Sequence, residues 1–267
     1  MDNLTNSIDQ VVEENALPHE WSKEVLAELK DLEVRNNKRD DLRKIPFVTI
    51  DGKDAKDFDD AVFCEANKDG FVLQVAIADV AEIVEPSSSI NKEALSRGTS
   101  IYFPKRVIPM LPEEISNNMC SLIPNEDRNV LVCKMNFTQK GEINSYDFSE
   151  SVINSHKRFT YNEVEFLKQN KDTNLSADIL NSINALEMLT KKLLHNRSKR
   201  CALEIESSEP TLSFGNEGNI SEIFIPKRLF AHQMIEEAMI SANICAAKFI
   251  KKHLGFGVYR IHEEPEH

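Results

Sequence analysis

Five aspartates crowd into the ten residues 51–60, directly after a short apolar run, FVTI, that predicts a buried strand. Packing like charges this closely costs free energy unless cations neutralise them. Carboxylate oxygens are the ligands that hard cations such as Mg²⁺ prefer. Two such ions about 4 Å apart can activate a water and stabilise the leaving oxygen when a phosphodiester is hydrolysed. The cluster therefore indicates a metal site suited to phosphodiester chemistry.

Two other interpretations of the acidic stretch compete with the metal site. A solvated acidic loop is common and explains the composition alone. A calcium-binding EF-hand loop would need ligands at fixed positions, but counting from Asp57 puts Ala61 at position 5 and Lys68 at position 12. Counting from Asp51 puts Lys53 at position 3, so neither register satisfies the EF-hand pattern. Spacing alone leaves the metal site and the solvated loop open.

The elements around the acidic stretch predict an α+β fold, with a mainly antiparallel sheet and surrounding helices. Apolar and β-branched runs predict strands at 47–50, 61–66, 71–81, 130–137 and 143–153, with hairpin turns at 68–70 and 139–142. Helical patterns cover 18–33, 90–98, 176–200 and 228–254. Residues 101–114 contain three prolines and predict a fixed, irregular loop, and short strands are expected at 202–207 and 222–226.

Composition bounds the class of protein and its setting. The 267 residues, 41% of them hydrophobic, are enough for one large domain with a sizeable core. Five scattered cysteines and a polar, acidic start predict a reducing, cytoplasmic setting without a leader peptide. No apolar run approaches the roughly 18 residues that span a bilayer. The net charge of −12 weighs against a nucleic-acid partner, because phosphate contacts are made mostly by Lys and Arg.

A resemblance to a known family, which covers about residues 18–267, favours a nucleic-acid partner in spite of the net charge. The run TIDGKDAKDFDDAV (49–62) is similar to a motif of the ribonuclease II/ribonuclease R (RNB) family. Four further segments follow in the family's order and at similar spacing: 75–84, 101–122, 159–164 and 235–247. The resemblance implies Mg²⁺-dependent 3′→5′ hydrolysis of single-stranded RNA to nucleoside 5′-monophosphates.

The resemblance also implies roles for particular residues. Four aspartates of the family's D-x5-D-x-D-D motif form its metal and catalytic centre, and the matching positions are Asp51, Asp57, Asp59 and Asp60; Asp54 lies between them and is expected to be a solvated turn residue. Tyr102 matches a tyrosine that stacks on RNA near its 3′ end. Tyr161 and Glu236 match positions linked to sensing the sugar, which must involve the 2′-OH.

The sequence also departs from the family pattern. Ile205 stands where the family often has a Phe that stacks on the terminal base. We expect residues 1–46 to form a charged helical lead-in, and residues 47–267 match the N-terminal part of an RNB-type catalytic domain. No cold-shock or S1 domain is visible in the sequence. The resemblance also places a catalytic arginine in the later half of the domain. We expect weak or no activity from such a span alone, and a C-terminal half or another protein as its partner. A non-catalytic RNA-binding or regulatory remnant is the alternative function.

Overall fold

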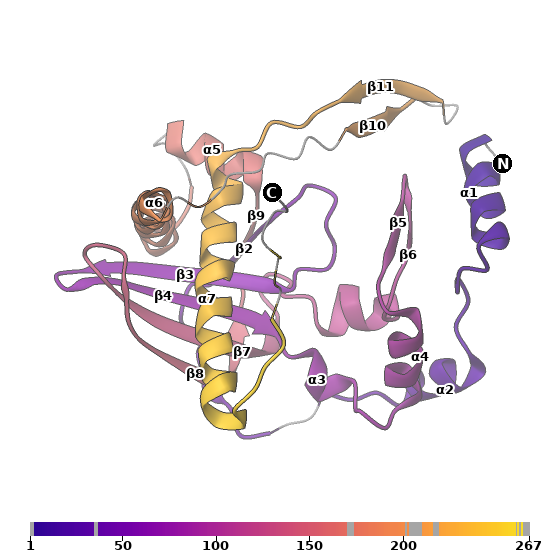
Figure 1. Ribbon diagram of the computed structural model, residues 1–267, viewed down its shortest axis with the longest axis horizontal. Coiled ribbons are helices and arrows are strands. Elements are labelled where there is room, and N and C mark those ends of the chain that lie inside the picture. Colours follow the sequence, from indigo (N-terminus) through magenta and orange to yellow (C-terminus); the bar gives the residue numbers. More distant parts are fainter. Residues whose placement is uncertain are drawn as a thin grey trace. The chain divides into compact units, whose positions relative to one another are not determined.

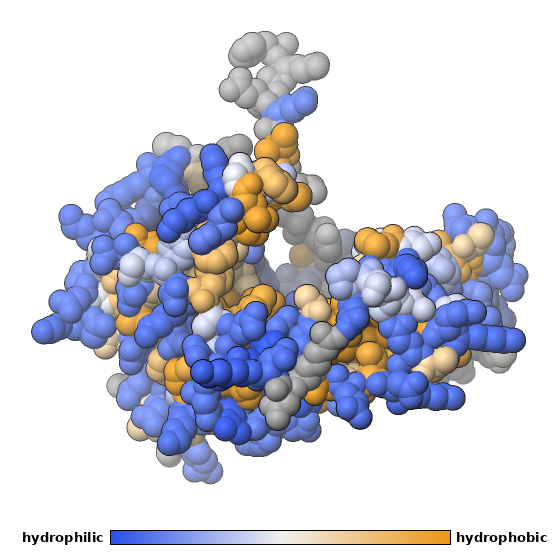
Figure 2. Space-filling model, turned by 90° about the horizontal axis from the view of Figure 1, so that it is seen from below, coloured by the Kyte–Doolittle hydropathy of each residue, from blue (hydrophilic) through white to orange (hydrophobic). Residues whose placement is uncertain are grey.

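The computed structural model describes residues 3–34, 37–169, 174–200, 202, 210–215, 219–259, 261 and 263. The chain divides into two compact units, each described here by itself. The first consists of Met1–Lys38, Asp79–Ser121 and Leu203–Arg228, and the second of Arg39–Ala78, Leu122–Ala202 and Leu229–His267. Figure 2 shows that hydrophilic residues cover much of one face of the molecule, with apolar residues scattered among them.

The second unit is built on a seven-stranded sheet with the order β1-β8-β7-β4-β3-β2-β9 (Figure 1). Its strands are β1 (Asp40–Asp41), β2 (Val48–Asp51), β3 (Asp60–Asn67), β4 (Gly70–Ala78), β7 (Asp127–Thr138), β8 (Ile143–Asn154) and β9 (Lys157–Thr160). Neighbouring strands are antiparallel except for the β1–β8 and β2–β9 pairs, which are parallel. The predicted α+β class and the two main hairpins are confirmed.

Turn chemistry explains why the two hairpins form where they do. Between β3 and β4, the Asn67 carboxamide accepts hydrogen bonds from the backbone N–H groups of Asp69 and Gly70. Gly70 has a φ of 150°, and a Cβ there would collide with the carbonyl oxygen of Phe137. Only glycine therefore fits at this point of the sheet. Gly141, with a φ of 78°, serves the turn between β7 and β8.

Three helices complete the second unit: α5 (Tyr161–Gln169), α6 (Ala177–Lys199) and α7 (Phe230–Leu254). Apolar residues of α6 and α7 join alternate residues of β3, β4 and β7 in one continuous core. Leu73, Met135, Leu189 and Met234 are fully buried in it. Ser176 caps the N-terminus of α6, and Gly255, in the left-handed conformation, ends α7. These bounds match the predicted helices at 176–200 and 228–254 closely.

The first unit holds the helices α1 (Asn3–Glu14), α2 (Lys23–Lys30), α3 (Val80–Ile83) and α4 (Ser89–Arg97), and the π-helix η1 (Glu114–Met119). Its two small hairpins pair β5 (Ile101–Phe103) with β6 (Arg106–Ile108) and β10 (Thr211–Phe214) with β11 (Ile220–Phe224). Ser22 and Ser88 cap α2 and α4.

Several expectations about the type or the bounds of individual elements are wrong. Residues 101–114 are not an irregular loop throughout, since they contain the β5–β6 hairpin, which turns at Pro104 and Lys105. Pro fixes φ at one position of the turn, and Lys105 supplies the positive φ of 64° at the next. The helix expected at 18–33 is shorter, because it begins after its Ser22 cap; Trp21 lies outside it, stacked under the Arg97 guanidinium at 3.5 Å. The strand expected at 71–81 ends at Ala78.

Candidate metal centre

The sheet brings three of the four motif aspartates to one edge of the second unit. Asp51 is the last residue of β2 and Asp60 the first residue of β3. These strands run antiparallel with Val48 opposite Val62, so the end of β2 lies beside the start of β3. Asp59 immediately precedes β3, and its carbonyl oxygen accepts a hydrogen bond from the Ala78 N–H at 2.9 Å. Backbone pairing therefore fixes the positions from which these carboxylates project.

Asp57 lies in the connecting loop, 52–59, which has contacts of its own to the sheet. The Phe58 side chain is buried, and its carbonyl oxygen accepts a hydrogen bond from the Leu122 N–H at 2.8 Å. Arg158, on β9, donates from Nη2 to the carbonyl oxygens of Gly52 at 3.0 Å and Lys53 at 2.7 Å. The same guanidinium lies 5.0 Å from the centre of the Phe58 ring. Arg158 thus contacts the loop near its start, at Gly52 and Lys53, and near its end, at Phe58.

Burial and mutual repulsion disfavour the charged forms of the clustered carboxyl groups. Burial raises the pKa of Asp60 to about 7, and the negative charges of Asp59 and Asp51 add to this effect. The pKa of Asp59 is also raised, first by burial and then by the charges of Asp51 and Asp57. A hydrogen bond joins the Asp59 and Asp60 side chains, which favours one shared proton between them. The four aspartates therefore act as one electrostatic unit.

The donor set suits Mg²⁺, although the side chains are not arranged as a finished cage. Among the described residues, no group of three or more His, Cys, Asp or Glu side chains converges to hold a metal ion. However, the Oδ2 atom of Asp60 is buried and has no hydrogen-bond partner. A buried, unpartnered carboxylate oxygen is costly, and a cation would remove that cost. Since the four motif residues offer carboxylate oxygens, they fit a hard divalent cation.

Tyr161 lies next to the acidic cluster because of strand pairing and helix capping. Asp51 pairs with Thr160 at the end of β9, and α5 begins at the next residue. Glu163 fixes this start, since its Oε2 accepts from the Thr160 N–H at 2.6 Å and the Thr160 hydroxyl at 2.9 Å. Burial raises the pKa of Tyr161 to about 12, with further contributions from Asp51, Asp60, Glu236 and Asp59 in that order. Tyr161 is therefore a neutral phenol close to the carboxylates.

The two neighbouring glutamates of α7 have different surroundings. Glu237 is buried, and its Oε1 atom accepts from Nη1 of Arg197, on α6, at 2.9 Å. Glu236 is only partly buried and lies near enough to Tyr161 to affect its pKa. The Tyr161 ring in turn stacks on His232 of α7, with the ring centres 3.9 Å apart. Glu236 thus lies near Tyr161, which is close to the cluster, whereas Glu237 joins two helices.

Two other residues of interest fall in the ranges of the first unit. Tyr102 lies on β5 of the first unit, where 72% of its surface is exposed. Ile205 lies outside the described residues. Sequence reasoning missed Arg158, His232 and Arg197, because no spacing rule links them to the aspartates. The only local signal was the position of Arg158 in a short polar strand, directly before the segment around Tyr161.

Comparison with known proteins gives consistent results. The RNB domain family model matches residues 39–267. The chain is 43% identical to ribonuclease R of Vibrio parahaemolyticus over 257 residues and 42% identical to ribonuclease R of Escherichia coli over 268 residues. These alignments cover 93% and 97% of this chain but only 31% and 33% of the relatives. The chain thus spans about a third of the length of the curated relatives that it matches.

Solved structures with the same fold include nucleases bound to RNA. Mycoplasma genitalium RNase R in complex with ribose-methylated single-stranded RNA superposes with a TM-score of 0.89 at 32% identity, covering 95% of this chain and 40% of that one. The same enzyme with double-stranded RNA gives a TM-score of 0.89 at 31% identity, covering 95% of this chain and 46% of that one. Yeast Ssd1, described as a pseudonuclease, has a TM-score of 0.63 at 15% identity, covers 90% of this chain and 28% of that one, and shares the fold alone.

Proposed function

Because the chain belongs to the RNB family, we propose that it forms the metal-binding part of a 3′→5′ exoribonuclease site. The proposed reaction is hydrolysis of the last phosphodiester bond of single-stranded RNA. Water attacks the phosphorus, the P–O3′ bond breaks, and the terminal nucleotide leaves as a nucleoside 5′-monophosphate. Residues 47–267 would be the first part of the catalytic domain and 1–46 a lead-in to it. The relatives are about three times as long, and the activity expected of this span alone is weak or absent.

The single observation that supports the proposal best is the buried, unpartnered Oδ2 atom of Asp60 within a group of repelling carboxylates. A fold gains no stability from such an arrangement by itself. Solvent-exposed aspartates would explain the sequence equally well, but a solvated loop does not bury a carboxylate and raise its pKa to about 7. The arrangement is typical of functional sites that bind a cation.

The four aspartates and Arg158 would have different roles in the site. Asp59 and Asp60 are the first candidates to hold Mg²⁺, while Asp51 and Asp57 complete or orient the site. When bound, Mg²⁺ would lower the pKa of the attacking water and neutralise charge on the phosphate. The loop contacts of Arg158 would keep Asp57 and Asp51 at a constant separation. These residues set up the geometry on which in-line attack depends.

Tyr161 and Glu236 are proposed to recognise the ribose. Since its pKa is about 12, Tyr161 keeps its proton and can donate a hydrogen bond to a 2′-OH. Glu236 can accept a hydrogen bond from the same hydroxyl group. A deoxyribose would leave both partners without that hydrogen bond. The exposed ring of Tyr102 is proposed as a stacking platform for a base, and its sequence-tolerant contact suits a processive enzyme.

A second candidate function is an RNA-binding or regulatory protein without catalysis. One observation favours it: the side chains in the part of the chain that the structure describes form no finished metal cage. Within the described residues, no helix combines the length and the apolar character needed to cross a membrane. The cytoplasmic location expected from the sequence remains a prediction.

The experiment that separates the two functions uses 5′-labelled single-stranded RNA with Mg²⁺, followed on a sequencing gel. Stepwise shortening from the 3′ end, lost in EDTA and in Asp60→Asn, is the expected result for an exoribonuclease. Asp54→Asn is the matched control, because Asp54 is an exposed aspartate of the same loop. RNA binding without shortening, by protein that circular dichroism shows to be folded, would support the non-catalytic function instead.

A further inference from the structure

The outer edge of β8 is largely unpaired. β8 pairs with β7 along its length, but on its other side β1 pairs with it only at Ser151 and Val152. No strand within the described ranges lies against residues Ile143–Glu150 on that side. Such an edge presents a row of backbone N–H and C=O groups to solvent, and it is a template on which another strand can pair.

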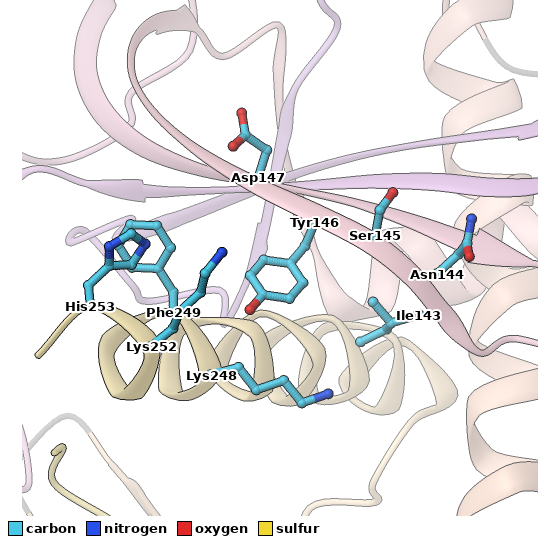
Figure 3. A pocket seen from close by; sticks show the side chains of 9 residues that line it. All are labelled: Ile143, Asn144, Ser145, Tyr146, Asp147, Lys248, Phe249, Lys252 and His253. Atoms are coloured by element: carbon cyan, nitrogen blue, oxygen red, sulfur yellow. The ribbon is translucent and has the colours of Figure 1, made fainter. Parts of the chain in front are cut away.

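A pocket of about 510 Å³ runs along this edge (Figure 3). Its lining from β8 consists of the five consecutive residues Ile143–Asp147. Successive side chains of a strand point to opposite faces, so a pocket that touches all five must follow the edge of the strand and its backbone. The opposite wall is the C-terminal half of α7. The pocket is thus a groove between an open sheet edge and a helix, all within the second unit.

Aromatic packing joins the two walls of this groove: Tyr146 and Phe249 line it, and Phe148, which does not line it, contacts both. Tyr146 and Phe148 of β8 pack edge to face, with their ring centres 6.0 Å apart. Phe148 also contacts Phe249 of α7 at 5.1 Å, and Phe249 contacts His253 at 4.3 Å. In Figure 3, Tyr146 extends from the strand toward α7. These contacts join strand and helix, so the width of the groove is fixed by packing rather than left to a loop.

The charge of the groove is positive on its helix wall. Lys248, Lys252 and His253 line it from α7. On the strand side, Asp147 lines it too, but Figure 3 shows its carboxylate directed away from α7. Glu150, further along β8, is exposed and does not line the groove. A ligand strand laid on the edge would therefore direct every second side chain toward the basic wall.

We propose that this groove binds an extended acidic peptide of a partner protein, which adds a strand to the edge of β8. Backbone pairing with Ile143–Asp147 provides the register, and acidic side chains at alternate positions meet Lys248 and Lys252. The open backbone edge favours a polypeptide over RNA, since a nucleic acid has no regular row of groups to pair with it. The proposal does not depend on nuclease activity, and the aspartate cluster has no part in it.

The test uses the full chain and a fluorescein-labelled ten-residue peptide of alternating Glu and Thr, followed by anisotropy at low salt. We expect saturable binding that is roughly tenfold weaker in Lys248→Glu/Lys252→Glu. Lys251→Glu is the control for a charge reversal on the same helix outside the groove: it reverses one charge where the double variant reverses two, and Lys251 does not line the groove. Lys248→Glu alone, which makes the same single reversal inside the groove, should weaken binding more than Lys251→Glu does. Asp60→Asn should bind as the wild type does, which keeps this test separate from that of the nuclease site.

Two further peptides test the mode of binding. A Lys–Thr peptide should not bind, and a Glu–Thr peptide N-methylated on alternate residues should lose binding because it cannot pair along one edge. Amide hydrogen exchange of Ile143–Asp147 should slow when the unmodified peptide binds. No saturable binding up to about 1 mM peptide, or equal binding of the N-methylated peptide, overturns the proposal. Two other results overturn the proposal. One is that Lys248→Glu/Lys252→Glu loses affinity for oligouridylate while its affinity for the peptide stays unchanged. The other is that the chain forms a dimer through this edge while peptide binding stays unchanged in the double variant.

Discussion

Replacing Asp60 by Asn should stabilise the metal-free chain. In the folded protein the pKa of Asp60 is raised from 3.8 to about 7, a difference of about 3 pKa units. Each pKa unit corresponds to about 1.4 kcal/mol, so holding the ionised carboxylate in place costs up to about 4 kcal/mol above pH 7. Asn has a similar shape and no charge. We expect the free energy of unfolding to rise by about 2–4 kcal/mol at pH 8 in EDTA.

The pH dependence of this effect has a definite sign. Because the folded pKa lies above the unfolded value, the protonated form is the one that the fold favours. The cost is therefore absent below about pH 4, grows between about pH 4 and 7, and is complete above about pH 7. Wild type and Asp60→Asn should have nearly equal stability at pH 4 and diverge as the pH rises.

Mg²⁺ should narrow this difference in stability. A cation that binds only the folded wild type adds about 1.4–2.7 kcal/mol at 10–100 times its Kd, and Asp60→Asn should gain little. Urea unfolding at pH 8, with EDTA or Mg²⁺, measures both effects, and Asp54→Asn is the control that should change neither. If Asp60→Asn is less stable than wild type in EDTA at pH 8, the assignment of Asp60 as a strained, cation-binding carboxylate is refuted.

Three further predictions concern Arg158, Tyr161 and Glu237. Arg158→Met should raise the Kd for Mg²⁺ measured by calorimetry by about tenfold, because loop 52–59 loses two hydrogen bonds. Arg158→Lys should restore part of the affinity, and equal affinity in wild type and both variants would contradict this role. Tyr161→Phe should narrow the preference for RNA over DNA by about tenfold in the same gel assay without changing Mg²⁺ affinity, and an unchanged preference would contradict it. Glu237→Gln should lower the free energy of unfolding by about 2–3 kcal/mol, since it leaves the Arg197 charge poorly paired. Lys191→Ala, which breaks an exposed ion pair, should lower it by less than about 0.5 kcal/mol. Similar losses in the two variants would refute the distinction between the buried and the exposed ion pair.

Sequence patterns were sufficient where local chemistry decides the structure. The strand before Asp51, both main hairpins and the helix ending at Gly255 follow from apolar periodicity and turn residues, and all are confirmed. The 101–114 segment failed because three prolines suggested a loop, whereas one of them, Pro104, is well suited to the hairpin turn that forms. Helix α1 was not predicted because its apolar residues, including Ile8 and Val12, are few in a polar segment.

The candidate site could be predicted only as far as local spacing reaches. The cluster of Asp51, Asp59 and Asp60 follows from one short stretch, and its family resemblance is confirmed. The approach of Tyr161 to these carboxylates depends on the pairing of β2 with β9, over 100 residues apart in sequence. Likewise, no periodicity distinguishes Glu236 from Glu237; the distinction comes from Arg197 on another helix. Long-range pairing of this kind leaves no signal in a single sequence.

The most direct test of the central claim is a calorimetric titration of the chain with Mg²⁺ at pH 8. It needs no RNA and no turnover, so it applies even if this span alone is inactive. We predict saturable binding that is lost in Asp59→Asn/Asp60→Asn and kept in Asp54→Asn. No saturable binding, or binding that the double substitution leaves unchanged, would contradict the assignment of the acidic cluster as a metal centre.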